Sequence, residues 1–182
     1  ALYDGETKTF YLYYRLRKPR ELGRGVNCRV AASQDGFSFE DIWQAEKEAL
    51  DSPSVEKSCI TKTPEGAFRL YISFVDGETN QWRIDVMEAD SPAGFDASGR
   101  TKVFVPEELG IEGIKDPVVY NIGGLHHMIV SYAPSPGAPS SEEEETMHAT
   151  GDVYNTGIVK SHTGLHTSED GLDWSWEGDI LS

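Results

Sequence analysis

The sequence has few cysteines, no long hydrophobic run and almost no helical periodicity. Two cysteines in 182 residues, Cys28 and Cys59, are too few for a disulfide scaffold and lack the spacing of a metal site. Both lie in apolar, strand-like segments and are interpreted as buried thiols. No segment approaches the roughly 18 apolar residues of a membrane span. Only residues 43–50 have a pattern that could form a short helix, which argues against a helical fold.

Basic residues are also scarce. The chain carries 31 acidic and 16 basic residues, a formal net charge of −15. Nucleic-acid partners call for basic patches, so this balance argues against them. It is compatible with a neutral or cationic ligand, or simply with a solvated acidic surface.

The length predicts one domain, residues 1–182, with its own core. No signal peptide is visible, but the chain opens directly in a turn at residues 2–5, so we expect the natural start to lie elsewhere. Localisation, cytoplasmic or secreted, and oligomeric state therefore stay open.

A repeat of about 60 residues organises the chain. Three turn glycines, Gly5, Gly66 and Gly124, are separated by 61 and 58 residues, and each precedes an equivalent strand. These strands read FYLYYR, FRLYIS and HHMIVS. Strands are expected at residues 9–15, 27–33, 37 onward, 54–63, 67–75, 82–89, 95–105, 125–132, 156–167 and 172–176.

A period near 60 with four short strands per unit predicts an all-β fold, a β-propeller of four-stranded antiparallel blades. We assign blade 1 to residues 1–50, blade 2 to residues 51–110 and blade 3 to residues 111–182. The innermost strand of blade 1 is expected to be missing. Because about three blades cannot close a ring of roughly four to eight, we expect the chain to be a fragment of a longer protein.

Blade topology sorts the connections onto two faces. Tight Asp-Gly turns, at Asp4, Asp35 and Asp170, fall on one face, where turn chemistry alone explains them. Long, irregular loops fall on the other face, where binding and catalysis usually occur. Eight candidate residues are expected to converge there. Asp116 and Glu56 are the catalytic candidates, and the expected substrate-binding residues are Arg15, Arg17, Arg24, Trp82, His148 and Asp152.

Asp116 is the leading catalytic candidate. It is expected at the mouth of a stiff, apolar strand, because Pro117 lacks a backbone N–H and suits a strand's first residues. Glu56 lies one repeat earlier at a comparable strand entrance. Two carboxylates facing one cavity suit glycoside chemistry, in which one gives a proton to the leaving oxygen and the other activates water or attacks carbon.

Several of these candidate residues could have a structural role instead of a functional one. Asp116 could simply start its strand, Glu56 could form a surface ion pair with Lys57, and Trp82 could be a packing residue rather than a stacking platform for a sugar. His148 is the better functional histidine, because His126 and His127 lie within a strand. The run from Glu142 to Glu145 is interpreted as a solvated loop. No metal site is assigned, although calcium in the channel stays open, and no cofactor is expected.

The chain resembles a known group of enzymes in three features: the repeated Asp-Gly turns before aromatic strands, Lys115-Asp116-Pro117 opening an inner strand, and Arg24-Gly25 followed by ASQDG at residues 32–36. These features resemble the five-bladed β-propeller glycoside hydrolases, the superfamily of arabinanases, xylosidases, levansucrases and invertases in glycoside hydrolase families 43 and 32.

The resemblance implies a role for Asp116 as the middle of three acids, which orients the proton donor or stabilises the transition state. It places the general base or nucleophile before Ala1 and, in arabinanase-like members, the proton donor beyond Ser182. Glu56 precedes Asp116 and so departs from that order, which makes substrate binding its alternative role.

The leading hypothesis is therefore a propeller that hydrolyses glycosidic bonds, with a carbohydrate ligand and neither nucleic acid nor a membrane as partner. A non-catalytic carbohydrate-binding or interaction propeller is the main rival, because a fold does not fix a function. A glycoside phosphorylase is the third possibility, and Arg15, Arg17 and Arg24 could then bind phosphate.

Overall fold

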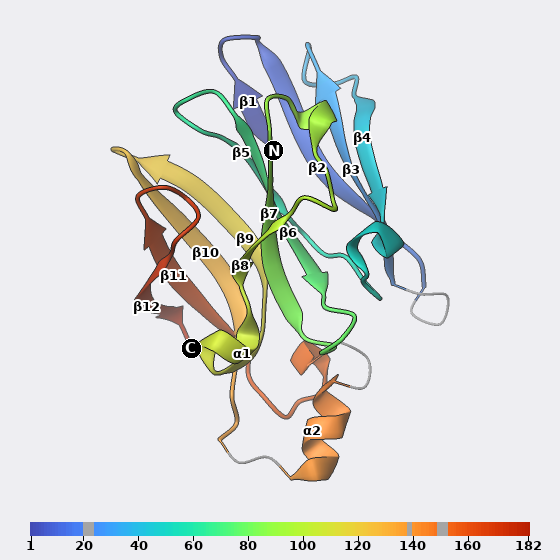
Figure 1. The fold of residues 1–182 in the computed structure, drawn as a ribbon, viewed down its shortest axis with the longest axis vertical. Coiled ribbons are helices and arrows are strands. Elements are labelled where there is room, and N and C mark those ends of the chain that lie inside the picture. The colour runs from blue at the N-terminus through green and yellow to red at the C-terminus, as the bar shows by residue number, and fades with distance from the viewer. Residues whose placement is uncertain (20–23, 138–139, 149–152) are drawn as a thin grey trace.

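The computed structural model describes residues 1–19, 24–137, 140–148 and 153–182, and it is built from three four-stranded antiparallel sheets (Figure 1). The first sheet contains β1 (Leu2–Asp4), β2 (Thr9–Arg17), β3 (Gly25–Ser33) and β4 (Glu40–Glu46). The second contains β5 (Cys59–Lys62), β6 (Phe68–Val75), β7 (Trp82–Ala89) and β8 (Thr101–Phe104). The third contains β9 (Ile111–Ile122), β10 (Leu125–Pro134), β11 (His162–Ser168) and β12 (Ser175–Leu181).

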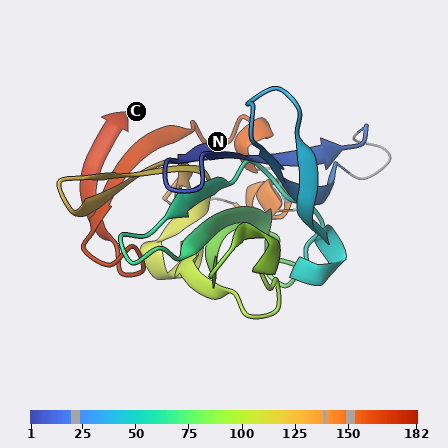
Figure 2. The ribbon, with the colours of Figure 1, turned by 90° about the horizontal axis from the view of Figure 1, so that it is seen from above.

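Each sheet is a simple meander in which every strand pairs with its neighbour in sequence, as in a propeller blade. Seen from above, the three blades follow one another as a fan (Figure 2). One apolar cluster joins blades 1 and 2 and includes Val30, Leu70 and Phe74. A second joins blades 2 and 3 and includes Tyr71 and Met128. The structure thus confirms the predicted all-β propeller with about three blades.

The inner strands of blades 2 and 3 lie side by side at equivalent positions of the repeat. The backbone N–H of Val119 in β9 donates a hydrogen bond to the Sγ of Cys59 in β5, at 3.3 Å. These two residues are 60 positions apart. The sequence period therefore corresponds to a direct contact between successive blades.

Two Asp-Gly turns have the same hydrogen bonds, at the upper end of Figure 1. The Oδ1 of Asp35 accepts bonds from the amides of Phe37 and Ser38, and the Oγ of Ser33 accepts one from Gly36. Asp170 and Ser168 repeat this pattern in blade 3. Hydrogen bonds from the Ser38 and Phe37 amides lower the pKa of Asp35 to about 2. Turn chemistry accounts for these aspartates.

The first blade is more complete than expected. Its innermost strand, predicted to be missing, is present as β1, which pairs with β2 through Leu2, Tyr3 and Asp4. It ends at Asp4, where the chain turns and the Asp4 carboxylate accepts bonds from the Glu6 amide and the Thr7 hydroxyl. Conversely, the strand expected over residues 54–63 is shorter than predicted and consists only of β5, Cys59–Lys62.

Helices occur where few were expected. The helix considered for residues 43–50 is only a 3-10 turn, η2 (Lys47–Leu50), because β4 continues to Glu46. Further 3-10 turns are η3 (Pro92–Gly94) and η4 (Val153–Asn155). The helix α1 (Pro106–Leu109) begins at a proline and is followed by Gly110 in the left-handed conformation, which are ordinary start and stop signals.

The acidic run expected in a loop, Glu142–Glu145, belongs instead to α2 (Ser141–His148). Ser140 and Glu143 form a capping box: the Ser140 Oγ accepts a bond from the Glu143 amide, and the Glu143 carboxylate accepts one from the Ser140 amide. The S-x-x-E pattern was the sequence signal for this helix. In the described part of the chain, no helix is long and apolar enough to cross a membrane.

Candidate active site

The irregular connections of blades 2 and 3 lie at one end of the molecule. The β6–β7 connection, α1, and the segment between β10 and β11 that carries α2 are at the lower end of Figure 1. The strands hold this end rigidly, because each connection begins and finishes in a paired strand. Binding and catalytic residues commonly occur on such connections when a rigid scaffold holds them.

Asp116 lies in a bulge of β9 rather than at the start of a strand. β9 begins at Ile111, so the expectation that Asp116 stands at the strand mouth is wrong. Asp116 and Pro117 together oppose the single residue Val130 of β10, because the register shifts between Ile129 and Ser131. A bulge tolerates Pro117, which has no N–H to give to the ladder.

The backbone of Asp116 is in the left-handed region, with φ of 58°. Aspartate adopts this conformation more readily than most residues, but it still costs free energy and persists only where neighbouring contacts impose it. The bulge re-aims the side chain, and the Asp116 carboxylate is 30% exposed. Local strain thus directs a partly accessible carboxylate out of an otherwise paired inner strand.

Lys115 is held between aromatic rings beside this carboxylate. Its Nζ lies 4.4 Å from the ring centroid of Tyr154, 5.2 Å from that of Trp82 and 3.8 Å from Oδ2 of Asp116. The Lys115 side chain is only 15% exposed. Aromatic faces attract a cation, so Lys115 is fixed as a positive charge next to Asp116.

Tyr154 interacts with both Lys115 and Asp116. Burial raises the pKa of Tyr154 well above its usual value, and the negative charge of Asp116 raises it further. Its hydroxyl donates a hydrogen bond to the carbonyl of Ser131 at 3.1 Å. Tyr154 therefore stays a neutral donor that ties η4 to β10 next to the bulge.

Ser73 of β6 connects the two candidate carboxylates through the backbone. Its carbonyl accepts a hydrogen bond from the amide of Glu56 at 2.8 Å. Its Oγ accepts one from the amide of Asp116 at 3.4 Å. Ser73 is completely buried, so it locates Glu56 and Asp116 relative to the same fixed strand.

Glu56 is paired with Arg15 of blade 1. The Arg15 guanidinium forms an ion pair with the Glu56 carboxylate, whose side chain is 13% exposed. The Glu56 carbonyl accepts bonds from the hydroxyls of Tyr13, at 2.8 Å, and Ser58, at 3.3 Å. Glu56 is therefore held in place by contacts to both its carboxylate and its carbonyl. The partner is Arg15 rather than Lys57, which is exposed.

The remaining predicted residues are spread more widely. Trp82 is 3% exposed and packs with Val75, Ala133 and Val153. It is therefore a packing residue, and little of its ring is open to a ligand. Arg17 is exposed at the end of β2. Arg24 is partly buried, with φ of 58°. His148 is the last residue of α2, and Asp152 lies outside the described residues.

Lys115, Tyr154 and Ser73 are the residues that the sequence interpretation did not select. Lys115 was adjacent to the chosen aspartate, and its charge was the available signal. Nothing in the sequence indicated that β6 or η4 would reach β9, because those contacts arise from packing between blades. Within the described residues, no group of three or more His, Cys, Asp or Glu side chains could hold a metal ion.

No protein-family model and no curated protein sequence matches this chain. Solved structures do match. A thermostable family-43 glycoside hydrolase superposes with a TM-score of 0.60 at 15% identity, over 100% of this chain and 54% of that one. An endo-arabinase from Bacteroides thetaiotaomicron gives 0.61 at 14% identity, over 98% and 54% of the two chains.

A third structure belongs to the GH130 family of mannoside phosphorylases, which contains glycoside hydrolases. It gives a TM-score of 0.56 at 14% identity, over 95% of this chain and 46% of that one. The chain spans about half the length of these three structures. At this level of identity the likeness concerns the fold, and the fold of this chain is the one shared by the propeller glycoside hydrolases and phosphorylases.

Proposed function

We propose that the end of the propeller that carries the irregular connections and α2 binds a carbohydrate. Asp116 supplies a carboxylate for hydrolysis of its glycosidic bond. The observation that carries the proposal is the Asp116 bulge. A strained backbone presents this carboxylate, 30% exposed, from an inner strand, with Lys115 fixed beside it. Such strain is concentrated at functional sites. The propeller fold shared with glycosidases supports the same assignment.

Hydrolysis breaks the bond between the anomeric carbon and the leaving oxygen. Water supplies a hydroxyl to the carbon and a proton reaches the leaving oxygen, so at least two acid–base groups are needed. We assign Asp116 to support of the charge that develops at the sugar ring or to orientation of the proton donor. Glu56, held by Arg15, is assigned to hydrogen bonding with sugar hydroxyls.

The test is Asp116→Asn in the full-length protein, assayed for release of reducing sugar from a panel of neutral oligosaccharides. Asparagine also tolerates the left-handed backbone, so the bulge should persist while the charge is lost. Turnover should fall at least about a hundredfold. Asp173→Asn, at an exposed turn on the opposite face, is the matched control and should retain turnover.

The outcomes separate the candidate functions. Wild-type-like turnover in Asp116→Asn would remove Asp116 from the mechanism. Calorimetric binding of an oligosaccharide without cleavage by the wild-type protein would favour a binding propeller. Turnover that requires phosphate would favour a phosphorylase, the activity described for the GH130 family to which one similar structure belongs. Because Arg15 is already paired with Glu56, fewer cationic side chains are available to bind phosphate. This pairing argues against a phosphorylase.

A further inference from the structure

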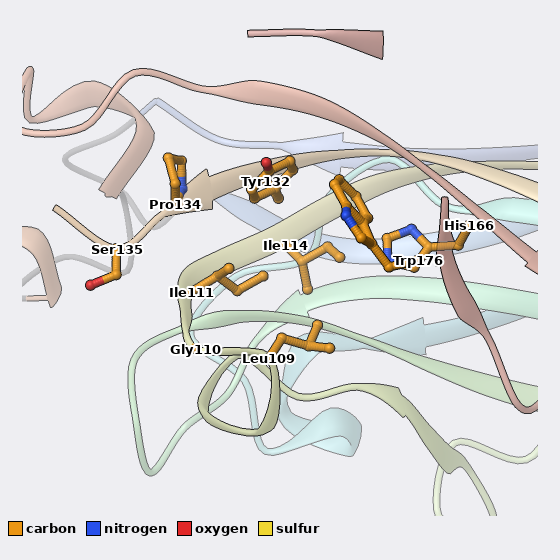
Figure 3. A pocket seen from close by; sticks show the side chains of 9 residues that line it. All are labelled: Leu109, Gly110, Ile111, Ile114, Tyr132, Pro134, Ser135, His166 and Trp176. Carbon is orange, nitrogen blue, oxygen red and sulfur yellow. The ribbon is translucent and has the colours of Figure 1, made fainter. Parts of the chain in front are cut away.

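A pocket of about 530 Å³ lies between α1 and the strands of blade 3 (Figure 3). Leu109, Ile111 and Ile114 line one side of it, and Tyr132, His166 and Trp176 line the other. None of Ser73, Trp82, Lys115 or Tyr154 contributes to its wall. The pocket, here called the Trp176 pocket, is therefore distinct from the candidate active site.

Trp176 is the unusual member of this pocket, because its large side chain is 51% exposed. Its ring lies against Gly164 of β11: a Cβ atom there would be 2.2 Å from Cζ3 of Trp176. The rings of Tyr132 and His166 meet it edge-on, with centroids 5.6 and 5.0 Å away. A glycine beneath the ring and two aromatic edges beside it fix the indole as a platform that is half open to solvent.

A polar group lies next to the platform. The Tyr132 hydroxyl donates a hydrogen bond to Oδ1 of Asp179 at 2.6 Å, and Nδ1 of His162 lies 3.0 Å from Oδ2 of the same carboxylate. The Asp179 side chain is 32% exposed. Asp179 therefore offers further acceptor positions near the pocket that are already oriented by two neighbours.

His166 provides the second sign of a ligand. It is 4% exposed, and its Nδ1 has no hydrogen-bond partner among the described residues. A buried polar atom without a partner costs free energy, which a hydroxyl group in the pocket would recover. Burial lowers the pKa of His166 to about 4, so the imidazole is neutral near pH 7 and can accept or donate one such bond.

These features define the chemistry of the ligand. A sugar ring has apolar faces that pack on an aromatic platform and hydroxyl edges that bond to imidazole and carboxylate groups. The net charge of −15 disfavours an anionic ligand. We propose that the Trp176 pocket binds one ring of a neutral glycan, stacked on Trp176 and hydrogen-bonded to His166 and Asp179. The proposal does not depend on catalysis by Asp116.

The experiment is a titration of the ¹⁵N-labelled protein with cellotriose, xylotriose and arabinotriose, followed through the indole N–H signals. The chain has four tryptophans. The Trp176 signal, assigned by its loss in Trp176→Phe, should shift saturably with at least one probe. Trp43 is the internal control, since its indole donates to the Phe95 carbonyl at the interface of blades 1 and 2 and should not shift.

Variants complete the test. Trp176→Ala lacks the reporting signal, so its affinity is measured by calorimetry; it should bind about tenfold more weakly or worse, the scale of a lost aromatic contact. Gly164→Ala should weaken it too, by displacing the indole, while an unchanged Trp43 signal reports intact folding. Asp116→Asn should leave this binding unchanged even if it abolishes turnover. Lack of a saturable Trp176 shift with all three probes, or equal affinity in Trp176→Ala, would overturn the proposal.

Discussion

The amide of Asp116 in blade 3 donates a hydrogen bond to the Oγ of Ser73 in blade 2, at 3.4 Å. The Ser73 carbonyl also accepts a hydrogen bond from the Glu56 amide. One buried serine therefore fixes the segments that carry Asp116 and Glu56. The geometry of the candidate site is therefore a property of the contact between blades. A single sheet would not reproduce it.

Ser73→Ala should separate these two functions of Ser73. The variant removes the Oγ acceptor and should lower the free energy of unfolding by about 1 kcal/mol. In native-state hydrogen exchange, the Asp116 amide should exchange faster, whereas the Glu56 amide should stay protected because its acceptor is the Ser73 backbone. Equal protection of Asp116 in variant and wild type would contradict the role of the side chain.

Lys115→Met should destabilise the protein by about 1–2 kcal/mol, because it removes a cation held by two aromatic rings and a carboxylate. Urea unfolding measures the change. Lys160→Met, at an exposed position, is the matched control and should stay within about 0.5 kcal/mol of wild type. If both variants lose the same stability, the environment of Lys115 contributes nothing particular.

Gly25→Ala should disturb the contact between blade 1 and the segment that carries Glu56. A Cβ atom at Gly25 would lie 2.1 Å from the Val55 carbonyl oxygen, so β3 and residues 54–56 must move apart. We expect a loss of about 1–3 kcal/mol, the range for overpacking. Gly5→Ala, where no atom lies within 4 Å, should be nearly neutral in the same thermal or urea unfolding experiment.

His166 should make the protein less stable in mild acid. Its pKa is lowered from 6.5 to about 4 by burial, so the unfolded chain takes up a proton between these values while the folded chain does not. Stability that is present above pH 6.5 is therefore lost as the pH falls toward 4, by up to about 3 kcal/mol. His166→Leu should lack this component, and indistinguishable pH profiles of unfolding would refute it.

Much of the fold could be predicted from the sequence because its signals are local. The turn glycines and Asp-Gly pairs require particular backbone conformations, and the strands between them are rich in β-branched and aromatic residues. Strand β7 coincides with the predicted segment at residues 82–89. The helices α1 and α2 were missed although each carried a local signal, a proline start in one and a capping box in the other.

The candidate site was predictable only in part. The choice of Asp116 rested on the proline after it, and the repeat drew attention to Glu56. The pairing of Glu56 with Arg15 depends on two blades meeting, as does the burial of Trp82. Interactions of this kind join residues with no regular sequence separation, so a periodic pattern carries no information about them.

The sequence by itself determined the all-β character, the repeat of about 60 residues and the position of the tight turns, since each depends on neighbouring residues and their backbone preferences. Only the tertiary structure decided that Asp116 occupies a left-handed bulge, that Lys115 lies between two aromatic rings, and that Trp176 stays half exposed over Gly164. The physical reason is that these features arise where strands and blades pack together, and packing depends on the shape of surfaces brought together from distant parts of the chain.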